Sequence, residues 1–237
     1  MRIGIFGRGK LGRAVTALIG KEKDLQLLWC VDKGEEPDAR VDVAFDSSAA
    51  EAVPGHLAWA QATGTDFVIA TTGWDRAILE GIESPGIGIL YAPNFSLGVA
   101  FMRRAALALG RFAALDAESD LAVVERHHRA KADAPSGTAK LLAEALAQGS
   151  GRHSGWVLGA AAPGKISVAS LRAGDEVGYH ELRLEGSAET LVLSHEARSR
   201  DIFAQGALRA LRWIRGRKGV FTFDDLVAEI IDPLFLA

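Results

Sequence analysis

The chain has 237 residues, of which 49% are hydrophobic and 24% are charged. This length allows one large or two small domains, and the composition is that of a folded globular protein rather than a disordered, collagenous or repetitive one. Lys and Arg number 27 and Asp and Glu number 30, so the formal net charge is -3. No overall positive field would therefore attract nucleic acid or an anionic membrane, and any bound anion must be held by a local cluster of residues.

Cysteine content and hydropathy predict the compartment. Cys30 is the one cysteine in the sequence and lies in the apolar run 27–31, so it cannot form an internal disulfide and fits a reducing environment. No apolar stretch reaches the roughly 18 to 20 residues that span a bilayer, and the N-terminus enters a strand-like segment without an apolar signal region. These features predict a cytoplasmic protein that binds neither nucleic acid nor membrane.

The first part of the chain alternates predicted strands with turns and helices. An apolar strand is followed by a glycine turn, by a helix through Ile19 and by a second apolar strand, which is the order of a βαβ unit in a parallel sheet. The predicted strands lie at residues 2–6, 25–31, 41–45, 66–71 and 87–91. Small polar residues follow several of them, which suits ligand contact because open α/β sheets bind ligands beyond the carboxyl ends of their strands.

The pattern changes at about residue 120, where strands follow one another with few helices between them. Predicted strands lie at 121–127, 166–172, 180–184 and 190–197, and predicted helices lie at 97–109, 138–147, 203–214 and 223–231. Such a series of strands is typical of an α+β unit with an open mixed sheet. The last two helices are expected to pack on the first part of the chain. We therefore predict an α/β protein with one domain at residues 1–96 and 200–237 and a second domain at 97–199.

A glycine-rich turn lies directly after the first strand and opens the first helix. Its sequence, Gly7-Arg8-Gly9-Lys10-Leu11-Gly12, has the form G-x-G-x-x-G, which permits a tight turn and brings the backbone close to a pyrophosphate at a helix N-terminus. The motif alone is weak, but Asp32 stands 20 residues after Gly12 at the end of the second strand, where an acid binds ribose hydroxyls. The alternative is that the glycines only form a turn and Asp32 only ends a strand. The combination favours a Rossmann-like domain that binds a nicotinamide dinucleotide.

Two neighbouring residues predict how this domain treats the two nicotinamide cofactors. The Asp32 carboxylate would repel the 2′-phosphate of NADPH, whereas Lys33 beside it could pair with that phosphate. We therefore expect both NADH and NADPH to be used, with NADH at least as good.

Residues 125–138, directly after a predicted strand, form the most unusual polar stretch in the chain. His127 and His128 are adjacent strand residues that point to opposite faces, and the sequence offers no cysteine or carboxylate at ligand spacing, so no metal is expected. Histidine and lysine supply acid chemistry near neutral pH, and the positive charge of Lys131 and its neighbours suits an anionic substrate.

The segment Pro135-Ser136-Gly137-Thr138 precedes a predicted helix. A helix N-terminus beside Lys131 would be a natural carboxylate site, because its first backbone N–H groups have no partner within the helix. The alternative is an ordinary helix cap in which Ser136 satisfies those donors itself. The position of the segment directly after the His-His-x-x-Lys run favours binding.

These residues resemble a known family. Residues 125–139, E-R-H-H-R-A-K-A-D-A-P-S-G-T-A, resemble the E-x-H-H-x-x-K-x-D-A-P-S-G-T-A signature of the 4-hydroxy-tetrahydrodipicolinate reductases, also called dihydrodipicolinate reductases, of lysine and diaminopimelate biosynthesis. Shorter matches at 12–13, 70–73, 92–96 and 195–207 are spread along the chain, so the resemblance extends over nearly its whole length.

The resemblance implies an NAD(P)H-dependent oxidoreductase that reduces 4-hydroxy-tetrahydrodipicolinate to tetrahydrodipicolinate. It implies that His127 is the acid/base residue and Lys131 the proton donor, and that the second domain binds the substrate and assembles a homotetramer. The substrate-binding residues that it implies are His128, Ser136, Gly137, Thr138 and Arg200. The expected cofactor-binding residues are Gly7, Arg8, Gly9, Lys10, Leu11, Gly12, Asp32, Lys33, Thr71, Thr72, Gly73, Ala92, Pro93, Asn94 and Phe95.

The sequence departs from the family pattern in one region and leaves two rival interpretations. The stretch between the second strand and Val41 is short, so a strand or helix of the cofactor domain is expected to be trimmed on the adenosine side. Trp74 stands where the family often has phenylalanine, which keeps an aromatic residue there. The rivals are a two-domain reductase of another small acid, such as an amino-acid dehydrogenase, and a nucleotide-sensing protein without catalysis. The His-His-x-x-Lys run argues against the second rival.

Overall fold

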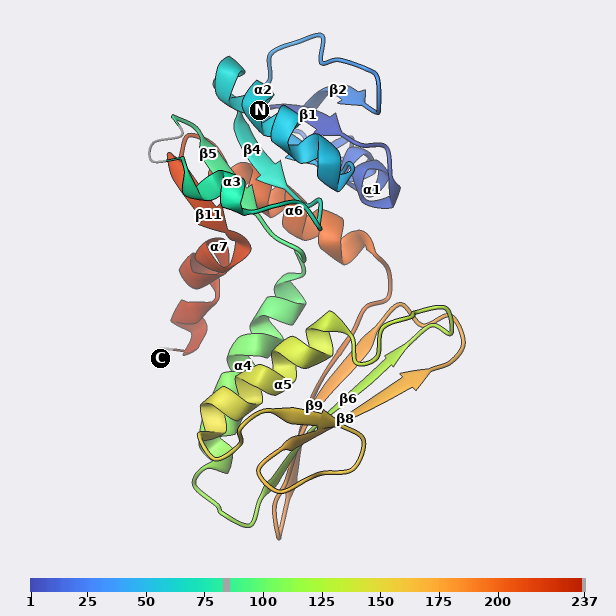
Figure 1. Cartoon of the computed structure of the whole chain (residues 1–237), viewed down its shortest axis with the longest axis vertical. Helices are drawn as coiled ribbons and strands as arrows, with labels where there is room; N and C mark the ends of the chain where they lie inside the picture. The colour runs from blue at the N-terminus through green and yellow to red at the C-terminus, as the bar shows by residue number, and fades with distance from the viewer. Residues whose placement is uncertain (83–85, 236–237) are drawn as a thin grey trace. The chain divides into compact units, whose positions relative to one another are not determined.

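The computed structural model describes residues 1–82 and 86–235 (Figure 1). It divides the chain into two compact units, Met1–Ser96 with Arg200–Ala237 and Leu97–Ser199. Each unit has its own β-sheet and its own helices packed on it.

The first unit contains a six-stranded parallel sheet in the order β11-β5-β4-β3-β1-β2. Its strands are β1 (Arg2–Phe6), β2 (Gln26–Val31), β3 (Val43–Asp46), β4 (Asp66–Ile69), β5 (Gly88–Tyr91) and β11 (Gly219–Thr222). Every residue of β3 and β4 is buried, because a parallel sheet carries helices on both faces.

Helices cover both faces of this sheet. Helix α1 (Lys10–Ile19) packs against α6 (Asp201–Ile214), which also contacts β3, β4 and β5. Helix α2 (Val53–Thr63) and the short α3 (Ala77–Glu80) contribute apolar residues to a core cluster that also contains Trp29 of β2 and Phe67 of β4. The remaining elements are the 3-10 turn η1 (Ala50–Ala52), helix α7 (Phe223–Ile230) and the 3-10 turn η2 (Asp232–Phe235).

The connection from β2 to β3, residues 32–42, forms neither helix nor strand. In the 3-2-1-4-5-6 order common in dinucleotide-binding sheets, a further strand lies outside the second one. Here β2 is the edge strand of the described sheet. The short connection in the sequence therefore corresponds to a missing edge strand on this side.

The second unit contains a mixed five-stranded sheet in the order β10-β9-β6-β8-β7. Its strands are β6 (Asp120–His127), β7 (Trp156–Leu158), β8 (Ile166–Arg172), β9 (Tyr179–Glu185) and β10 (Thr190–Glu196). Strand β6 pairs parallel with β8 and antiparallel with β9. Helices α4 (Leu97–Ala113) and α5 (Gly137–Ser150) pack on one face, and burial alternates along β6, so its opposite face is open.

The predicted fold class is confirmed, and several element limits were wrong. The helix predicted to end at Leu109 runs to Ala113, because Gly110 faces α5 instead of ending α4: a Cβ atom there would lie 2.5 Å from the Leu146 carbonyl oxygen. The strand predicted at 66–71 ends at Ile69, because the N–H groups of the next two residues donate to the Asp46 carbonyl. Helices α2 and α3 and strands β7 and β11 were not predicted.

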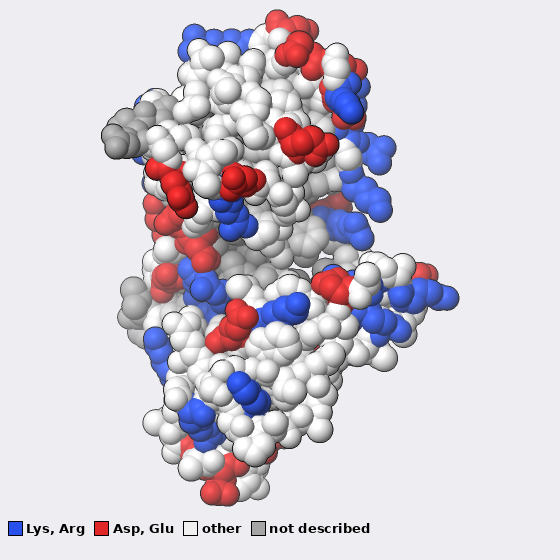
Figure 2. Space-filling model, in the orientation of Figure 1, with Lys and Arg blue, Asp and Glu red and all other residues white. Residues whose placement is uncertain are grey.

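The distribution of surface charge and the hydropathy of the helices agree with the near-neutral net charge and with the lack of a long apolar stretch in the sequence. Figure 2 shows Lys and Arg side chains interspersed with Asp and Glu over the face that it draws, without a large area of one sign. Within residues 1–82 and 86–235, no helix combines the length and the apolar character that crossing a membrane requires.

Candidate active site

The glycine turn connects β1 to α1 through very close backbone packing. Gly7 has a φ angle of 97°, and a Cβ atom on Gly12 would lie 2.0 Å from the Gly7 carbonyl oxygen and 2.9 Å from the hydroxyl of Ser47. Helix α1 begins at Lys10 and has no acidic residue in its first turn. The turn therefore fits a pyrophosphate, because it offers backbone N–H groups at a helix N-terminus without a competing carboxylate.

The end of β2 carries the residues expected to meet the adenosine ribose. Asp32 and Lys33 are exposed. The Arg8 guanidinium lies 2.6 Å from a Glu35 carboxylate oxygen and donates to the Cys30 carbonyl, and Glu35 also accepts the Asp32 N–H at 3.1 Å. Hydrogen bonding to Arg8 lowers the pKa of Glu35. Glu35, which had no role in the sequence analysis, thus adds a second carboxylate where the cofactor 2′-position is expected.

Two cavities border the predicted nicotinamide residues of the first unit. A cavity of about 190 Å³ is lined in part by Thr71, Thr72, Gly73, Ala92 and Pro93. A second cavity of about 300 Å³ is lined in part by Lys10, Leu11, Pro93, Asn94, Phe95 and Arg200. The structure thus brings together the glycine turn, the segment after β5 and Arg200 within one unit.

A buried carboxylate supports the loop that follows β4. Asp46, which is fully buried at the end of β3, accepts a 2.5 Å hydrogen bond from the Thr71 hydroxyl and a 2.8 Å bond from the Ser48 hydroxyl, and lies 2.6 Å from His56 Nδ1. The Trp74 indole N–H donates to the Thr71 carbonyl at 2.8 Å. The aromatic residue noted at position 74 therefore ties down the same loop.

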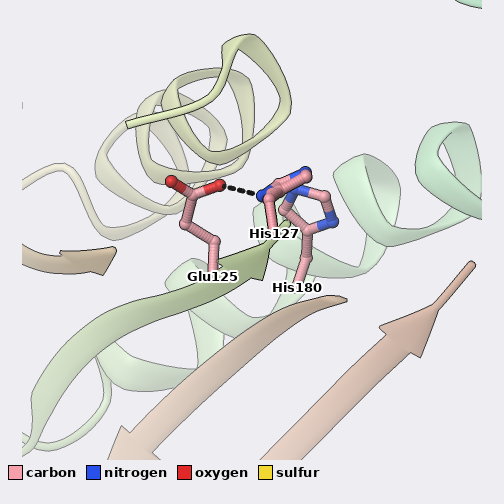
Figure 3. A group of neighbouring side chains, drawn as sticks. All are labelled: Glu125, His127 and His180. Atoms are coloured by element: carbon pink, nitrogen blue, oxygen red, sulfur yellow. Dashed lines mark ion pairs between the residues drawn. The ribbon is translucent and has the colours of Figure 1, made fainter. Parts of the chain in front are cut away.

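In the second unit, His127 and Glu125 lie on the same face of β6, because side chains alternate along a strand. His127 Nδ1 is 2.8 Å from Glu125 Oε2 (Figure 3). Glu125 is fully buried, and its other oxygen accepts 2.6 Å and 3.1 Å hydrogen bonds from Arg172 of β8 and the Ser136 N–H. His180 of β9 is directly opposite Glu125, and its ring centroid lies 5.1 Å from that of His127.

The protonation states follow from burial and from these contacts. Burial would raise the pKa of Glu125, but the hydrogen bonds from Arg172 and from the Ser136 N–H outweigh it and lower the pKa to about 2. Burial lowers the pKa of His127, opposed by the Glu125 charge, and lowers that of His180 to about 4. Near neutral pH the group therefore contains an ionised Glu125 and two largely neutral imidazoles.

The other predicted polar residues occupy the loop after β6. Lys131 Nζ lies 2.7 Å from Asp133 Oδ1, and its side chain is 23% exposed. Hydrogen bonding to Lys131 lowers the pKa of Asp133. His128, the neighbour of the catalytic candidate His127, is half-buried and donates its backbone N–H to the Glu176 carbonyl.

The start of α5 shows how the Ser136 side chain is used within the fold. Ser136 is the N-cap of α5: its hydroxyl accepts the Ala139 N–H at 3.1 Å and lies 3.2 Å from His180 Nε2. Gly137 and Thr138 occupy the first turn, where backbone N–H groups have no partner within the helix. Ser136 therefore caps α5, and the binding role expected of Ser136, Gly137 and Thr138 stays a prediction.

The reason given for expecting no metal was wrong in one respect. Glu125, His127 and His180 place one ligand atom each within 4.8 Å of one another, so a carboxylate does lie within reach of His127. The Arg172 guanidinium lies 2.6 Å from the Glu125 carboxylate and already neutralises its charge. The positive charge of Lys131 also lowers the pKa of His127. This charge pattern does not fit a divalent cation, and the absence of a metal stays a prediction.

Three residues of this cluster had no role in the sequence analysis. Glu125 could have been found, because it stands two residues before His127 and strand side chains repeat with a period of two. Arg172 and His180 carried no local signal, because they reach the site only through the pairing of β6 with β8 and β9.

Comparison with known proteins identifies the family. A family model described as dihydrodipicolinate reductase, N-terminus, matches residues 1–95, and one described as dihydrodipicolinate reductase, C-terminus, matches residues 97–227. The chain belongs to the dihydrodipicolinate reductase family.

Relatives of this reductase family match almost the whole chain. The 4-hydroxy-tetrahydrodipicolinate reductase of Laribacter hongkongensis is 36% identical over 239 residues, which cover 94% of this chain and 89% of that protein. That of Caldanaerobacter subterraneus subsp. tengcongensis is 33% identical over 255 residues, with coverage of 97% and 99%. A dipicolinate-bound dihydrodipicolinate reductase from Paenisporosarcina sp. TG-14 shares the fold, with a TM-score of 0.79, 21% identity and coverage of 95% and 98%.

Membership of the dihydrodipicolinate reductase family confirms the resemblance stated from the sequence. It makes the chain an NAD(P)H-dependent oxidoreductase, in agreement with the nucleotide site expected at the glycine turn.

Proposed function

We propose that the chain reduces 4-hydroxy-tetrahydrodipicolinate to tetrahydrodipicolinate, with His127 and Lys131 as the proton-handling residues. The observation that carries this proposal is the site at the end of β6, where these two residues precede the N-terminus of α5. A dicarboxylate needs positive charge and N–H donors, and this segment supplies both. The dipicolinate named in the Paenisporosarcina structure belongs to the same substrate class.

The first unit holds the cofactor in this proposal. The close packing of Gly7 and Gly12 and the two neighbouring cavities fit a dinucleotide, with the pyrophosphate at the start of α1. When bound, the reduced nicotinamide supplies a hydride to the substrate. Both NADH and NADPH are expected to serve, because Asp32 and Lys33 act in opposite directions on the 2′-phosphate.

The second unit holds the substrate and supplies the proton. The N–H groups of Gly137 and Thr138 grip one carboxylate, and the Lys131 ammonium adds charge in place of its contact with Asp133. We also assign to substrate binding His128 and Ser136 of the second unit and Arg200, which belongs to the first unit. The 4-hydroxyl group leaves as water before or during reduction. Hydride addition then produces an enamine-like carbon in the substrate, and Lys131 or His127 protonates that carbon.

The decisive experiment follows NADH oxidation with substrate generated in place from pyruvate and aspartate semialdehyde by the preceding synthase. Steady oxidation that depends on the synthase product supports the proposal. A protein that binds NADH but does not oxidise it with this substrate would instead favour reduction of a different acid.

We also propose that copies of this chain cover the open face of the second sheet in a homotetramer. On that face the Arg126 guanidinium stacks 3.8 Å from the centre of the Tyr179 ring, while Leu171 and Val192 are 53% and 50% exposed. The molar mass from light scattering tests this: a tetramer is expected, and Val192→Arg should dissociate it. A monomeric wild-type protein would contradict the proposal.

The proposed compartment is the cytoplasm, and no nucleic acid or membrane partner is expected. Cys30 is the sole cysteine of the sequence, and the charges of both signs are nearly balanced. Cell fractionation with antibody detection tests the compartment.

A further inference from the structure

Glu125 is fully buried, and its two carboxylate oxygens have different partners. One oxygen accepts hydrogen bonds from Arg172 at 2.6 Å and from the Ser136 N–H at 3.1 Å, while the other lies 2.8 Å from His127 Nδ1. A buried charge is costly unless it is paired, and Arg172 together with Ser136 already supply that pairing. The second oxygen is therefore available for His127.

The approach of Glu125 to His127 is close but does not have the geometry of a regular hydrogen bond. Within the described part of the chain, Glu125 Oε2 and His127 Nδ1 are both buried and neither has another hydrogen-bond partner. Figure 3 shows the carboxylate beside this nitrogen, with the other ring nitrogen on the side away from Glu125. The two buried atoms therefore face each other at 2.8 Å with no competing partner among the described residues.

This contact selects one form of the neutral imidazole. An ionised carboxylate only accepts hydrogen bonds, so the single N–H of neutral His127 is stabilised at Nδ1. Nε2 is then left with its lone pair, and it can take up a proton and release it. The electrostatic attraction also favours the protonated ring.

The ring is confined on its other side by a residue without a side chain. A Cβ atom on Gly178, which is buried just before β9, would lie 3.0 Å from His127 Nε2 and 3.3 Å from Cδ2. The imidazole thus stands between the Glu125 carboxylate and the Gly178 backbone. This position leaves little room for the ring to turn.

We propose that Glu125, itself held by Arg172, is a positioning residue that orients His127 and fixes its proton at Nδ1, so that Nε2 exchanges a proton with the substrate site. This proposal rests on the function proposed above. It assigns no substrate contact to Glu125, which is fully buried.

The charged and titratable groups around His127 determine how a change at Glu125 acts. Glu125 lies on the same strand, Arg172 on β8 and His180 on β9, and Lys131 and Asp133 lie in the following loop. Burial is the largest influence and lowers the pKa of His127; Lys131 and Arg172 lower it further, and Glu125 raises it. Replacing Glu125 by glutamine should therefore lower the pKa of His127 further.

The first test needs no variant. Nitrogen-15 NMR of the full-length protein, with His127 assigned by comparison with His127→Gln, distinguishes the two neutral imidazole forms. The expected wild-type spectrum has the proton on Nδ1 above the pKa of His127. A proton on Nε2 would overturn the proposal, whether or not the protein turns over 4-hydroxy-tetrahydrodipicolinate.

The second test compares Glu125→Gln and Glu125→Asp with Glu144→Gln, a control at an exposed carboxylate on α5. Glu125→Gln is expected to lower kcat by about 10- to 100-fold with little change in KM for NADH, and to lower the pKa of His127 measured by NMR. Glu125→Asp keeps the charge and should restore part of both quantities, while the control keeps both. An unchanged His127 pKa in a folded Glu125→Gln protein would overturn the proposal.

Discussion

At its candidate site, the first unit presents backbone, whereas the second presents buried, titratable side chains. The turn after β1 depends on glycines whose backbone packs too closely to admit a Cβ atom, and the side chains at the end of β2 are exposed. At the end of β6, Glu125, His127 and His180 are all buried and come from two strands.

The difference indicates how each site responds to change. A site made of backbone is sensitive to steric bulk and largely indifferent to pH, because amide groups do not titrate in the physiological range. A site made of buried ionisable groups is sensitive to charge, since burial and neighbouring charges change each pKa. Variants that add bulk should therefore damage the first unit, and variants that alter protonation should damage the second.

The largest expected effect is at the proton-handling residues. His127→Gln or Lys131→Ala should lower kcat by at least about 100-fold, because the acid that protonates the substrate is lost. NADH binding, measured by fluorescence titration, should stay unchanged because both residues lie in the second unit. Wild-type turnover in both variants would remove the proposed chemistry from this site.

Added bulk in the glycine turn should have the next largest effect. In Gly12→Val, the new side chain would start 2.0 Å from the Gly7 carbonyl oxygen, so the turn must open and NADH affinity should fall by at least about tenfold. Gly55→Ala is the matched control, because a Cβ atom there meets nothing within 4 Å. Equal NADH affinity in the two variants would show that the turn does not hold the cofactor.

Acid should destabilise the second unit through the buried His180. The pKa of His180 falls from the ordinary 6.5 to about 4, so the folded state binds fewer protons than the unfolded state, and stability present above 6.5 is lost as the pH falls toward 4. Glutamine does not titrate. Between pH 6.5 and 4 the free energy of unfolding of His180→Gln should therefore fall by roughly 2 to 3 kcal/mol less than that of the wild type.

Urea unfolding of the wild type and His180→Gln across this pH range measures the difference. Protonation of Glu125, whose pKa is about 2, adds acid destabilisation below 4.5 in both proteins, so the comparison between them isolates His180. Parallel stability curves for the two proteins above that pH would show that His180 does not sense acid.

The smallest expected effect concerns the choice of cofactor at the exposed end of β2. Glu35→Gln removes a carboxylate and releases Arg8 from its 2.6 Å ion pair, so affinity for NADPH should rise a few-fold relative to NADH. Glu36→Gln is the control in the same exposed loop. Separately, a wild-type protein that binds NADPH more than about tenfold tighter than NADH would contradict the role given to Asp32.

Sequence patterns were sufficient where the chemistry is local. Gly7 to Gly12 lie between a strand and a helix within one short segment, and His127 to Thr138 are nearly contiguous, so spacing alone revealed both. The same spacing also contained Glu125, whose place two residues before His127 puts both on one face of β6. Its pairing with His127 was nevertheless missed, because a strand face indicates which side chains lie together but not which charges they meet.

By itself, the sequence determined the α/β class, the glycine turn, the His-His-x-x-Lys run and the start of α5, because each depends on backbone geometry within a few neighbouring residues. The tertiary structure decided the environment of those residues. Arg172 and His180 reach Glu125 only because β8 and β9 flank β6, and Gly110 continues α4 only because α5 packs against it. The pKa of a buried group and the length of a packed helix depend on such distant neighbours, so neither could be obtained from local pattern alone.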